Sequence, residues 1–476
     1  MNETKNKEYQ LNNYRIEKIN NKFLITTDHG SWCFLNKEDF DLLIKEGFQE
    51  KPELFNVLEE KGIILTNENK DKIIKLLKDR FHFLFQGTSL HIIIPTLRCN
   101  QKCVYCHASS KPIDDKGEEM DEETAKKTVD FIFQSPSKTI IIEFQGGEPL
   151  IKFDIIKYII NYAKKLNKEK KKNLVFTVVT NLTLMNEDKM NYFIENSVGV
   201  CTSLDGPAEL HNKNRPFMNN VESYKFTEKW IKRFTEEYKK KKIENRKMNA
   251  LITITRESLK YPKEIIDKYV ELGLKDIHLR FLNNLGDARP VWESINYSPE
   301  EFINFWKKSI DYLLEINKKN IFLRERTCFI ILRKILTNID PNFLDMRSPC
   351  GAAIGQLTYT PNGDIFTCDE ARMVGEDIFK LGNTKKDTYK KILTSRQTCG
   401  IITSSINDSQ ICDSCAYKPY CGICPVCNYM EQGSIIVNIL KTARCKIYKA
   451  QFTYLFEKLQ HPEYKKIFVD WIKKSE

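Results

Sequence analysis

The region between residues 90 and 319 alternates short apolar runs with longer amphipathic segments, and this alternation constrains the fold more than any other feature of the chain. Short apolar runs predict buried strands, and apolar residues repeated every three or four positions predict helices. The predicted strands lie at 90–94, 138–144, 174–179, 199–203, 247–254 and 276–281. The predicted helices lie at 121–133, 152–166, 186–195, 223–238 and 262–272. Six strand–helix repeats predict an α/β fold whose parallel sheet curves into a partial (β/α)6 TIM-like barrel, with ligands at the carboxyl ends of the strands.

Three cysteines follow the first predicted strand at the spacing C-x3-C-x2-C, namely Cys99, Cys103 and Cys106. Thiolates on a tight loop are ligands for iron–sulfur clusters and for zinc. A [4Fe–4S] cluster has four irons, so three cysteines leave one iron open to a small molecule. The spacing alone does not separate such a reaction centre from a zinc site.

The C-x3-C-x2-C loop, with Tyr105 directly before its last cysteine, resembles the signature of the radical S-adenosylmethionine (SAM) superfamily. The resemblance implies that the open iron binds SAM, which is cleaved to a 5′-deoxyadenosyl radical that abstracts a hydrogen atom. It extends to segments that follow the later strands. The SAM contacts that it implies are Tyr105, Gly146, Gly147, Glu148, Asn181, Ser203, Arg215 and Leu285.

Several of these residues also suit such contacts physically. Gly146 and Gly147 allow a close approach of the backbone to a ligand. Glu148 is an acceptor for an ammonium group, and the guanidinium fork of Arg215 matches a carboxylate with two parallel hydrogen bonds. An ordinary turn is the alternative for the glycine pair and for Asn181.

A second concentration of cysteines lies between residues 350 and 445 and contains C-x2-C pairs. Clustered pairs of this kind indicate metal binding, either to iron–sulfur clusters or to zinc. The sequence Pro361-Asn-Gly-Asp predicts a turn, and therefore a hairpin of 356–360 and 365–368 with Cys368 on its second strand.

The order of these cysteines resembles the SPASM extension of radical SAM enzymes, which holds two auxiliary [4Fe–4S] clusters. The resemblance implies a first auxiliary site with Cys350 and Cys368, and a second site whose ligands are Cys412, Cys415, Cys421 and Cys445. The usual position of the remaining ligand is Pro425 here, and it is flanked by Cys424 and Cys427. Both are candidates for the first site, and Cys424 is favoured.

Two further expectations concern residues near these cysteines. Asp369 directly follows Cys368 and matches an aspartate that serves as a general base in the related sulfatase-maturating enzymes; local hydrogen bonding at a hairpin end is the alternative. The cysteines outside the pattern are expected to be buried small residues: Cys33, Cys201, Cys328 and Cys399.

Residues 1–86 lack a cysteine cluster and predict a hairpin at 14–25, a strand at 32–35, and helices that start after Asn36 and at Pro52. Strands followed by small helices resemble the winged-helix-like module of peptide maturases, which binds a leader peptide by adding it to a sheet edge. A structural cap on the barrel is the alternative. A DNA-binding winged helix is disfavoured because no helix here has a dense basic face.

Composition limits the remaining classes of function. The 15 cysteines favour metal ligation over disulfides, and the absence of a 20-residue apolar run excludes a membrane span. The net charge of +11 neglects ligating thiolates, so it gives little support for nucleic-acid binding. With no apolar signal segment at residues 1–8, a cytoplasmic protein is expected.

The expected domains are a leader-recognition module (1–86), a radical SAM partial barrel (87–320), a helical linker (321–348), a SPASM domain (349–450) and a C-terminal helix (451–476). The residues in and around the cysteine motifs are most similar to those of maturases of His-Xaa-Ser-type peptides. This resemblance implies hydrogen abstraction from a side chain of a ribosomally made precursor peptide, followed by an oxidative carbon–carbon or thioether crosslink. It also implies three [4Fe–4S] clusters and an external one-electron reductant of the flavodoxin or ferredoxin type. The alternatives are formylglycine formation on a sulfatase and a multi-cluster electron carrier or zinc scaffold.

Overall fold

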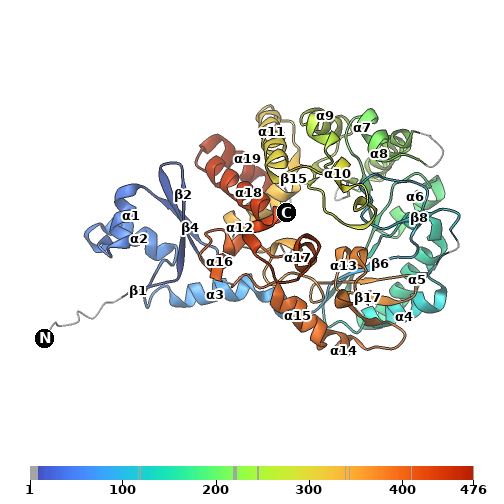
Figure 1. Ribbon diagram of the computed structural model, residues 1–476, viewed down its shortest axis with the longest axis horizontal. Coiled ribbons are helices and arrows are strands. Elements are labelled where there is room, and N and C mark those ends of the chain that lie inside the picture. The colour runs from blue at the N-terminus through green and yellow to red at the C-terminus, as the bar shows by residue number, and fades with distance from the viewer. Residues whose placement is uncertain are drawn as a thin grey trace.

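The computed structural model describes residues 9–474, except 116, 118, 218–221, 244–245, 338, 342–343 and 409. The segment used to predict localisation, residues 1–8, lies outside this part, as do the last two residues of the expected C-terminal helix. Figure 1 shows an N-terminal unit at one end of the molecule and the barrel at the other, with the helices α18 (Ala443–Leu459) and α19 (Pro462–Lys473) between them.

A nine-stranded sheet forms the centre of the protein, in the order β14-β12-β11-β10-β9-β6-β16-β17-β18. Its first six strands are mutually parallel, as predicted from the alternating pattern. They are β6 (Leu90–Ile93), β9 (Thr139–Phe144), β10 (Asn173–Val179), β11 (Val198–Ser203), β12 (Asn249–Thr253) and β14 (Leu279–Arg280). The last predicted strand, 276–281, is split into two short strands. Its second part, β14, joins the nine-stranded sheet, whereas its first part, β13 (Asp276–Ile277), pairs with β15 (Arg324–Glu325).

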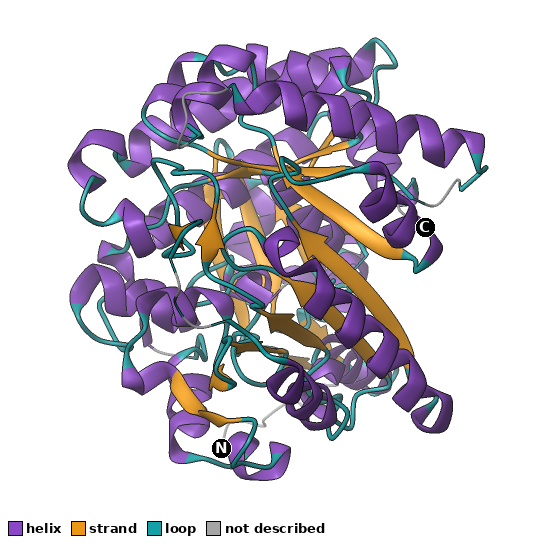
Figure 2. Cartoon of the chain, turned by 90° about the vertical axis from the view of Figure 1, so that its right-hand side faces the viewer, coloured by secondary structure: helices purple, strands orange, loops and turns teal. Residues whose placement is uncertain are grey.

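Helices cover the outside of this sheet (Figure 2). Those between the barrel strands are α4 (Glu122–Ile132), α5 (Phe153–Lys170), α6 (Glu187–Glu195), α7 (Ala208–Asn214), α8 (Ser223–Lys240) and α9 (Glu264–Glu271). The side chains of Asp121 and Asn186 cap α4 and α6 by accepting backbone N–H bonds. The helices α10 (Trp292–Ile295), α11 (Pro299–Lys318) and α12 (Arg326–Leu336) complete the layer.

The cysteine-rich region continues the barrel sheet. β16 (Gln356–Tyr359) pairs in parallel with β6 and antiparallel with β17 (Asp364–Phe366), which in turn pairs with β18 (Lys380–Asn383). The predicted hairpin is therefore confirmed, but the placement of Cys368 was wrong. The strand ends at Phe366, and Cys368 is the N-cap of α13 (Asp369–Val374), because its sulfur accepts the backbone N–H of Ala371. The remaining helices are α14 (Tyr389–Leu393), α15 (Arg396–Ser404), α16 (Gln410–Asp413) and α17 (Pro425–Gln432).

The N-terminal unit, residues 9–86, contains an antiparallel sheet in the order β2-β3-β4. The predicted hairpin is β2 (Tyr14–Ile19) with β3 (Lys22–Thr27), and the predicted strand is β4 (Trp32–Leu35). The helices are α1 (Lys37–Ile44), which Asn36 caps as predicted, α2 (Pro52–Glu60) and α3 (Lys70–Arg80). A two-stranded pairing of β1 (Gln10–Leu11) with β5 (Ile64–Leu65) was not predicted. The winged-helix comparison stays a prediction.

His29 is a buried titratable group that joins the parts of this unit. Its Nε2 lies 3.1 Å from the hydroxyl of Thr27 and 3.1 Å from the carbonyl of Lys61, and burial lowers its pKa to about 4. A depressed histidine pKa contributes stability that is present above the unfolded-state pKa of about 6.5 and is lost as the pH falls through the folded-state value.

We therefore expect the free energy of unfolding to fall between pH 6.5 and 4, in part through His29. His29→Leu should flatten this slope by up to about 1.4 kcal/mol per pH unit, the value for one proton. Guanidinium unfolding of the full chain at pH 7, 6 and 5 measures it. Equal slopes for the variant and the wild type would contradict the assignment.

No helix within the described residues is long and apolar enough to cross a lipid bilayer.

Candidate functional site: three groups of cysteines

The first group of cysteines lies on the loop that follows β6. Burial raises the pKa of Cys99, and the nearby thiols of Cys103 and Cys106 raise it further. Burial also raises the pKa of Cys103 to about 12, with a smaller contribution from the thiol of Cys106. The loop is held by backbone bonds from Lys102 to Pro216 and from Val104 to Asn214. The segment that follows β11 and α7 therefore supports the predicted cluster loop.

Tyr105 and Arg215 form a buried network behind this loop, together with Asp205. The Tyr105 hydroxyl lies 2.8 Å from both carboxylate oxygens of Asp205, and Nη1 of Arg215 lies 2.6 Å from that hydroxyl. Burial raises the pKa of Asp205 to about 6. Nη2 of Arg215 also donates to the side-chain oxygen of Gln101, at 3.4 Å. The network fixes Arg215 beside the loop, and its predicted contact with a SAM carboxylate remains a prediction.

The predicted SAM motif at 146–148 packs against the cysteine loop itself. A Cβ on Gly146 would lie 2.3 Å from the carbonyl oxygen of Thr96, and one on Gly147 would lie 2.2 Å from that of Arg98. The backbone N–H of Glu148 donates to the same Arg98 carbonyl at 2.7 Å. The glycines are thus required by an approach to the protein backbone, whereas the sequence predicted an approach to a ligand.

Glu148 is completely buried and accepts three hydrogen bonds. The donors are the N–H of Leu150 (3.0 Å), the hydroxyl of Thr180 (2.7 Å) and the N–H of Asn181 (2.8 Å). Burial raises its pKa. An ionised carboxylate has about four acceptor positions, so capacity for one further donor remains. Glu148 joins the turns after β9 and β10.

The other predicted SAM contacts have different surroundings. Asn181 points toward the first group, since its amide nitrogen lies 3.9 Å from the sulfur of Cys99 and 3.0 Å from the side-chain oxygen of Asn100. Ser203 is half-buried at the end of β11. Leu285 is buried in an apolar cluster with Cys350, Cys368 and Cys424, so it contacts the cysteine-rich region.

The second group comprises Cys350, Cys368 and Cys424. The thiols of Cys424 and Cys350 raise the pKa of Cys368, after burial and the charge of Glu370. Cys424 is the N-cap of α17, and its sulfur accepts the N–H of Cys427. Cys427 belongs to the same buried apolar cluster. Its sulfur lies 3.0 Å from Nη2 of Arg444 and 3.9 Å from the side-chain oxygen of Asn283.

The third group contains Cys412, Cys415, Cys421 and Cys445. Burial is the main cause of the raised pKa of Cys421, and the nearby thiols of Cys415, Cys445 and Cys412 raise it further. Cys412 lies in α16, Cys415 and Cys421 lie in the segment that follows it, and the first turn of α18 supplies Cys445.

Helix α13 connects the first and second groups. Asp369, on its first turn, is buried and pairs with Nε of Arg372 at 2.9 Å, and Nη1 of Arg372 donates to the carbonyl of Ala108 at 3.1 Å. Glu370 pairs with Arg280, at the end of β14. From the sequence, no role was assigned to Gln101, Asp205, Arg280 and Arg372. Gln101 lies within the cysteine loop and Asp205 two residues after Ser203, but the hydrogen-bond partners of these four side chains are set only by the fold.

The cysteines outside the three groups differ in burial. Cys33 and Cys328 are buried, as expected, whereas Cys201 is half-buried. Cys399 is exposed on α15, so its predicted burial was wrong.

The donor chemistry of the three groups suits iron–sulfur clusters. Among the residues that the structure describes, no three His, Cys, Asp or Glu side chains converge closely enough to hold a single metal ion. A [4Fe–4S] cluster takes its thiolates on separate irons, so its ligands stand further apart than those of one ion. Groups of three, three and four buried or half-buried thiols have the ligand type that such clusters take.

The chain is similar to several known proteins. The profile of the radical SAM superfamily matches residues 93–269. A cysteine-type anaerobic sulfatase-maturating enzyme of Clostridium perfringens (strain 13 / Type A) is 26% identical over 373 residues, which cover 76% of this chain and 94% of that protein. The fold resembles native anSMEcpe with bound AdoMet and Cp18Cys peptide, with a TM-score of 0.66 and 23% identity over 79% of this chain and 99% of the other. It also resembles Streptococcus suis SuiB bound to precursor peptide SuiA, with a TM-score of 0.55 and 16% identity over 90% and 98% of the two chains.

Proposed function

This chain is an enzyme with a radical SAM domain at residues 93–269, and on that premise we propose that it modifies a ribosomally made precursor peptide. The observation that carries the proposal is the N-terminal sheet. Within the described residues, the outer strands β2 and β4 each pair only with β3, so both offer an edge to an extended peptide. The peptides bound to SuiB and to anSMEcpe support a substrate of this class.

The domain implies SAM and one [4Fe–4S] cluster, which Cys99, Cys103 and Cys106 would hold. When bound, these cofactors supply one-electron cleavage of a sulfonium and hydrogen-atom abstraction. The chain's own residues hold the loop in place. The Tyr105–Asp205–Arg215 network holds Tyr105 within the loop, and the turn at Gly146 and Gly147 packs against residues 96–98, where the loop begins.

We further propose two auxiliary clusters, which brings the total to three. Cys350, Cys368 and Cys424 would hold the first, since the thiols of Cys424 and Cys350 act on that of Cys368. Cys427 lies in the same cluster, but its sulfur faces the guanidinium of Arg444. Cys412, Cys415, Cys421 and Cys445 would hold the second. Asp369 is the proposed general base, placed on α13 between the first two groups. An external one-electron reductant completes the proposal.

The expected product is an oxidative carbon–carbon or thioether crosslink in the precursor peptide. Anaerobic co-expression with small open reading frames encoded beside the gene should give a peptide that is lighter by two hydrogens and resists sequencing by fragmentation between the linked residues. Mass spectrometry of the purified peptide measures both properties. An unmodified peptide would contradict the proposal.

Formylglycine formation on a sulfatase is a second candidate, favoured by the 26% identity to a cysteine-type sulfatase-maturating enzyme. It would convert a sulfatase-derived peptide to an aldehyde that hydroxylamine traps, with no crosslink. The electron-carrier and zinc-scaffold alternatives fall away, because the chain is an enzyme that acts through radical chemistry.

A further inference from the structure

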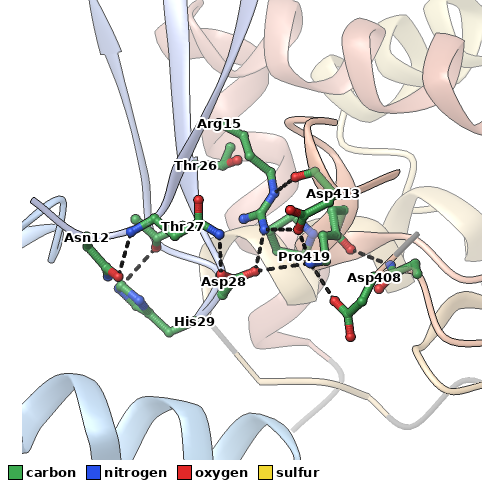
Figure 3. Close-up of polar contacts among 12 residues, drawn as sticks. Asn12, Arg15, Thr26, Thr27, Asp28, His29, Asp408, Asp413 and Pro419 are labelled. Carbon is green, nitrogen blue, oxygen red and sulfur yellow. Dashed lines mark hydrogen bonds and ion pairs between the residues drawn. The ribbon is translucent and has the colours of Figure 1, made fainter. Parts of the chain in front are cut away.

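The segment from Asp408 to Cys421 carries three of the four cysteines of the third group but little regular structure of its own. Its described residues form only α16 and the short 3-10 helix Lys418–Tyr420. The positions of its cysteines therefore depend on contacts from other parts of the chain. Figure 3 shows that many of these contacts come from the N-terminal unit.

Three side chains of the N-terminal unit donate hydrogen bonds to backbone carbonyls of this segment. Nε of Arg15, on β2, donates to Asp413. The hydroxyl of Thr26, on β3, donates to Ala416 at 2.8 Å, and a guanidinium nitrogen of Arg80, at the end of α3, donates to Pro419. These carbonyls are interspersed with Cys412, Cys415 and Cys421, so the bonds restrain the backbone on both sides of Cys415.

Charged groups reinforce the same contact (Figure 3). Nη2 of Arg15 lies 2.7 Å from the carboxylate of Asp28 and 3.1 Å from that of Asp413, and only 1% of the Arg15 side chain is exposed. Nζ of Lys418 pairs with Asp408 at 2.5 Å and with Asp413 at 2.6 Å. The side chains of Asp28 and Asp413 are 39% and 52% exposed, so their carboxylates stay solvated without Arg15. Removal of the guanidinium acts instead by taking away both ion pairs and the hydrogen bond to the Asp413 carbonyl.

The helix that carries the fourth cysteine is held by the same unit. The ring of Trp32, on β4, packs edge-on against Phe456 of α18, with the centroids 5.3 Å apart. Tyr420 donates its hydroxyl hydrogen to the carbonyl of Gly30 at 3.0 Å and also packs against Phe456. One sheet therefore contacts both the loop and the helix that supply the third group.

We propose that the N-terminal unit is a clamp that sets the geometry of the Cys412–Cys415–Cys421–Cys445 site, with Arg15 as its main positioning residue. The inference rests on the proposed second auxiliary cluster and deepens it. It follows that residues 9–86 are not a separable peptide-binding module. Their deletion disturbs a metal site in addition to any leader recognition, so deletion alone cannot test leader binding.

The test uses the full chain, reconstituted anaerobically with iron and sulfide. Arg15→Met removes the guanidinium, and Lys18→Met is the matched control, because Lys18 is an exposed cation on the same strand. Arg15→Met should lose about a third of the bound iron, since one of three clusters is lost. It should also lose one electron paramagnetic resonance signal of the reduced protein, the same signal that is lost in Cys412→Ala. Lys18→Met should keep both the iron and this signal.

Two milder variants separate positioning from general misfolding. Arg15→Lys keeps the charge and should restore part of the iron, although it cannot reproduce the fork. Thr26→Val removes one hydroxyl and should alter the shape of the same signal with the iron retained. Full iron and unchanged signals in both Arg15→Met and Thr26→Val would overturn the clamp, provided that Cys412→Ala loses iron. If Cys412→Ala itself keeps all its iron and signals, the proposed second auxiliary cluster is refuted. The clamp proposal, which rests on that cluster, is then refuted as well.

Discussion

Alanine at Gly147 is expected to destabilise the protein and to impair assembly of the first cluster. The added Cβ would lie 2.2 Å from the carbonyl oxygen of Arg98 and 2.3 Å from that of Leu97, distances at which backbone has to move. Overpacking of this kind costs about 3 kcal/mol. The backbone that moves leads directly into Cys99, so we also expect less iron bound at the first group.

Gly400→Ala is the matched control for this substitution. Gly400 lies within α15, and a Cβ there would meet no atom within 4 Å. Alanine in an open helical position stabilises by roughly 0.5–1 kcal/mol. Guanidinium unfolding and iron analysis of both variants measure the contrast. If Gly147→Ala unfolds at the same denaturant concentration as Gly400→Ala, the close approach of the turn to the cysteine loop is wrong.

The parallel strands could be predicted because their information is local. Each is an apolar run bounded by polar turns, and strands separated by helices pair in parallel with their neighbours. The continuation of the sheet into β16 could not be predicted in this way. Its partner β6 lies far away in the sequence, and nothing in the 356–359 run specifies which sheet edge it joins.

The candidate site shows the same division. The cysteines were recognised from their spacing, but the residues that hold them were not. Asp205 and Gln101 contribute single polar side chains to a network that exists only after folding. Arg15 and Thr26 have the appearance of ordinary strand residues in the sequence, and their contact with the loop depends on how two distant units pack.

The glycine pair illustrates a further limit. Two adjacent glycines at the end of a strand correctly indicate that something approaches the backbone closely. They do not identify what approaches. At Gly146 and Gly147 it is the chain itself, at Thr96 and Arg98, and this contact fixes the entry to the cysteine loop.

The largest effect on activity is expected from Cys103→Ala. The Cys103 thiol interacts with Cys99, Cys106 and Arg215, and its loss leaves two thiols for a cluster that needs three. Release of 5′-deoxyadenosine from SAM under dithionite should fall to the background without enzyme. Chromatography of the reaction measures this product, and iron analysis should show a loss of about a third.

Two cysteine variants make this result specific. Cys399→Ala changes an exposed thiol outside all three groups and should keep full iron and full release of 5′-deoxyadenosine. Cys427→Ala should also keep its iron, because the Cys427 sulfur faces Nη2 of Arg444 at 3.0 Å, whereas the thiols that raise the pKa of Cys368 are those of Cys424 and Cys350. Undiminished SAM cleavage by Cys103→Ala would refute the first cluster site. Loss of iron from Cys427→Ala would instead reassign a ligand of the first auxiliary cluster and leave the reaction centre unchanged.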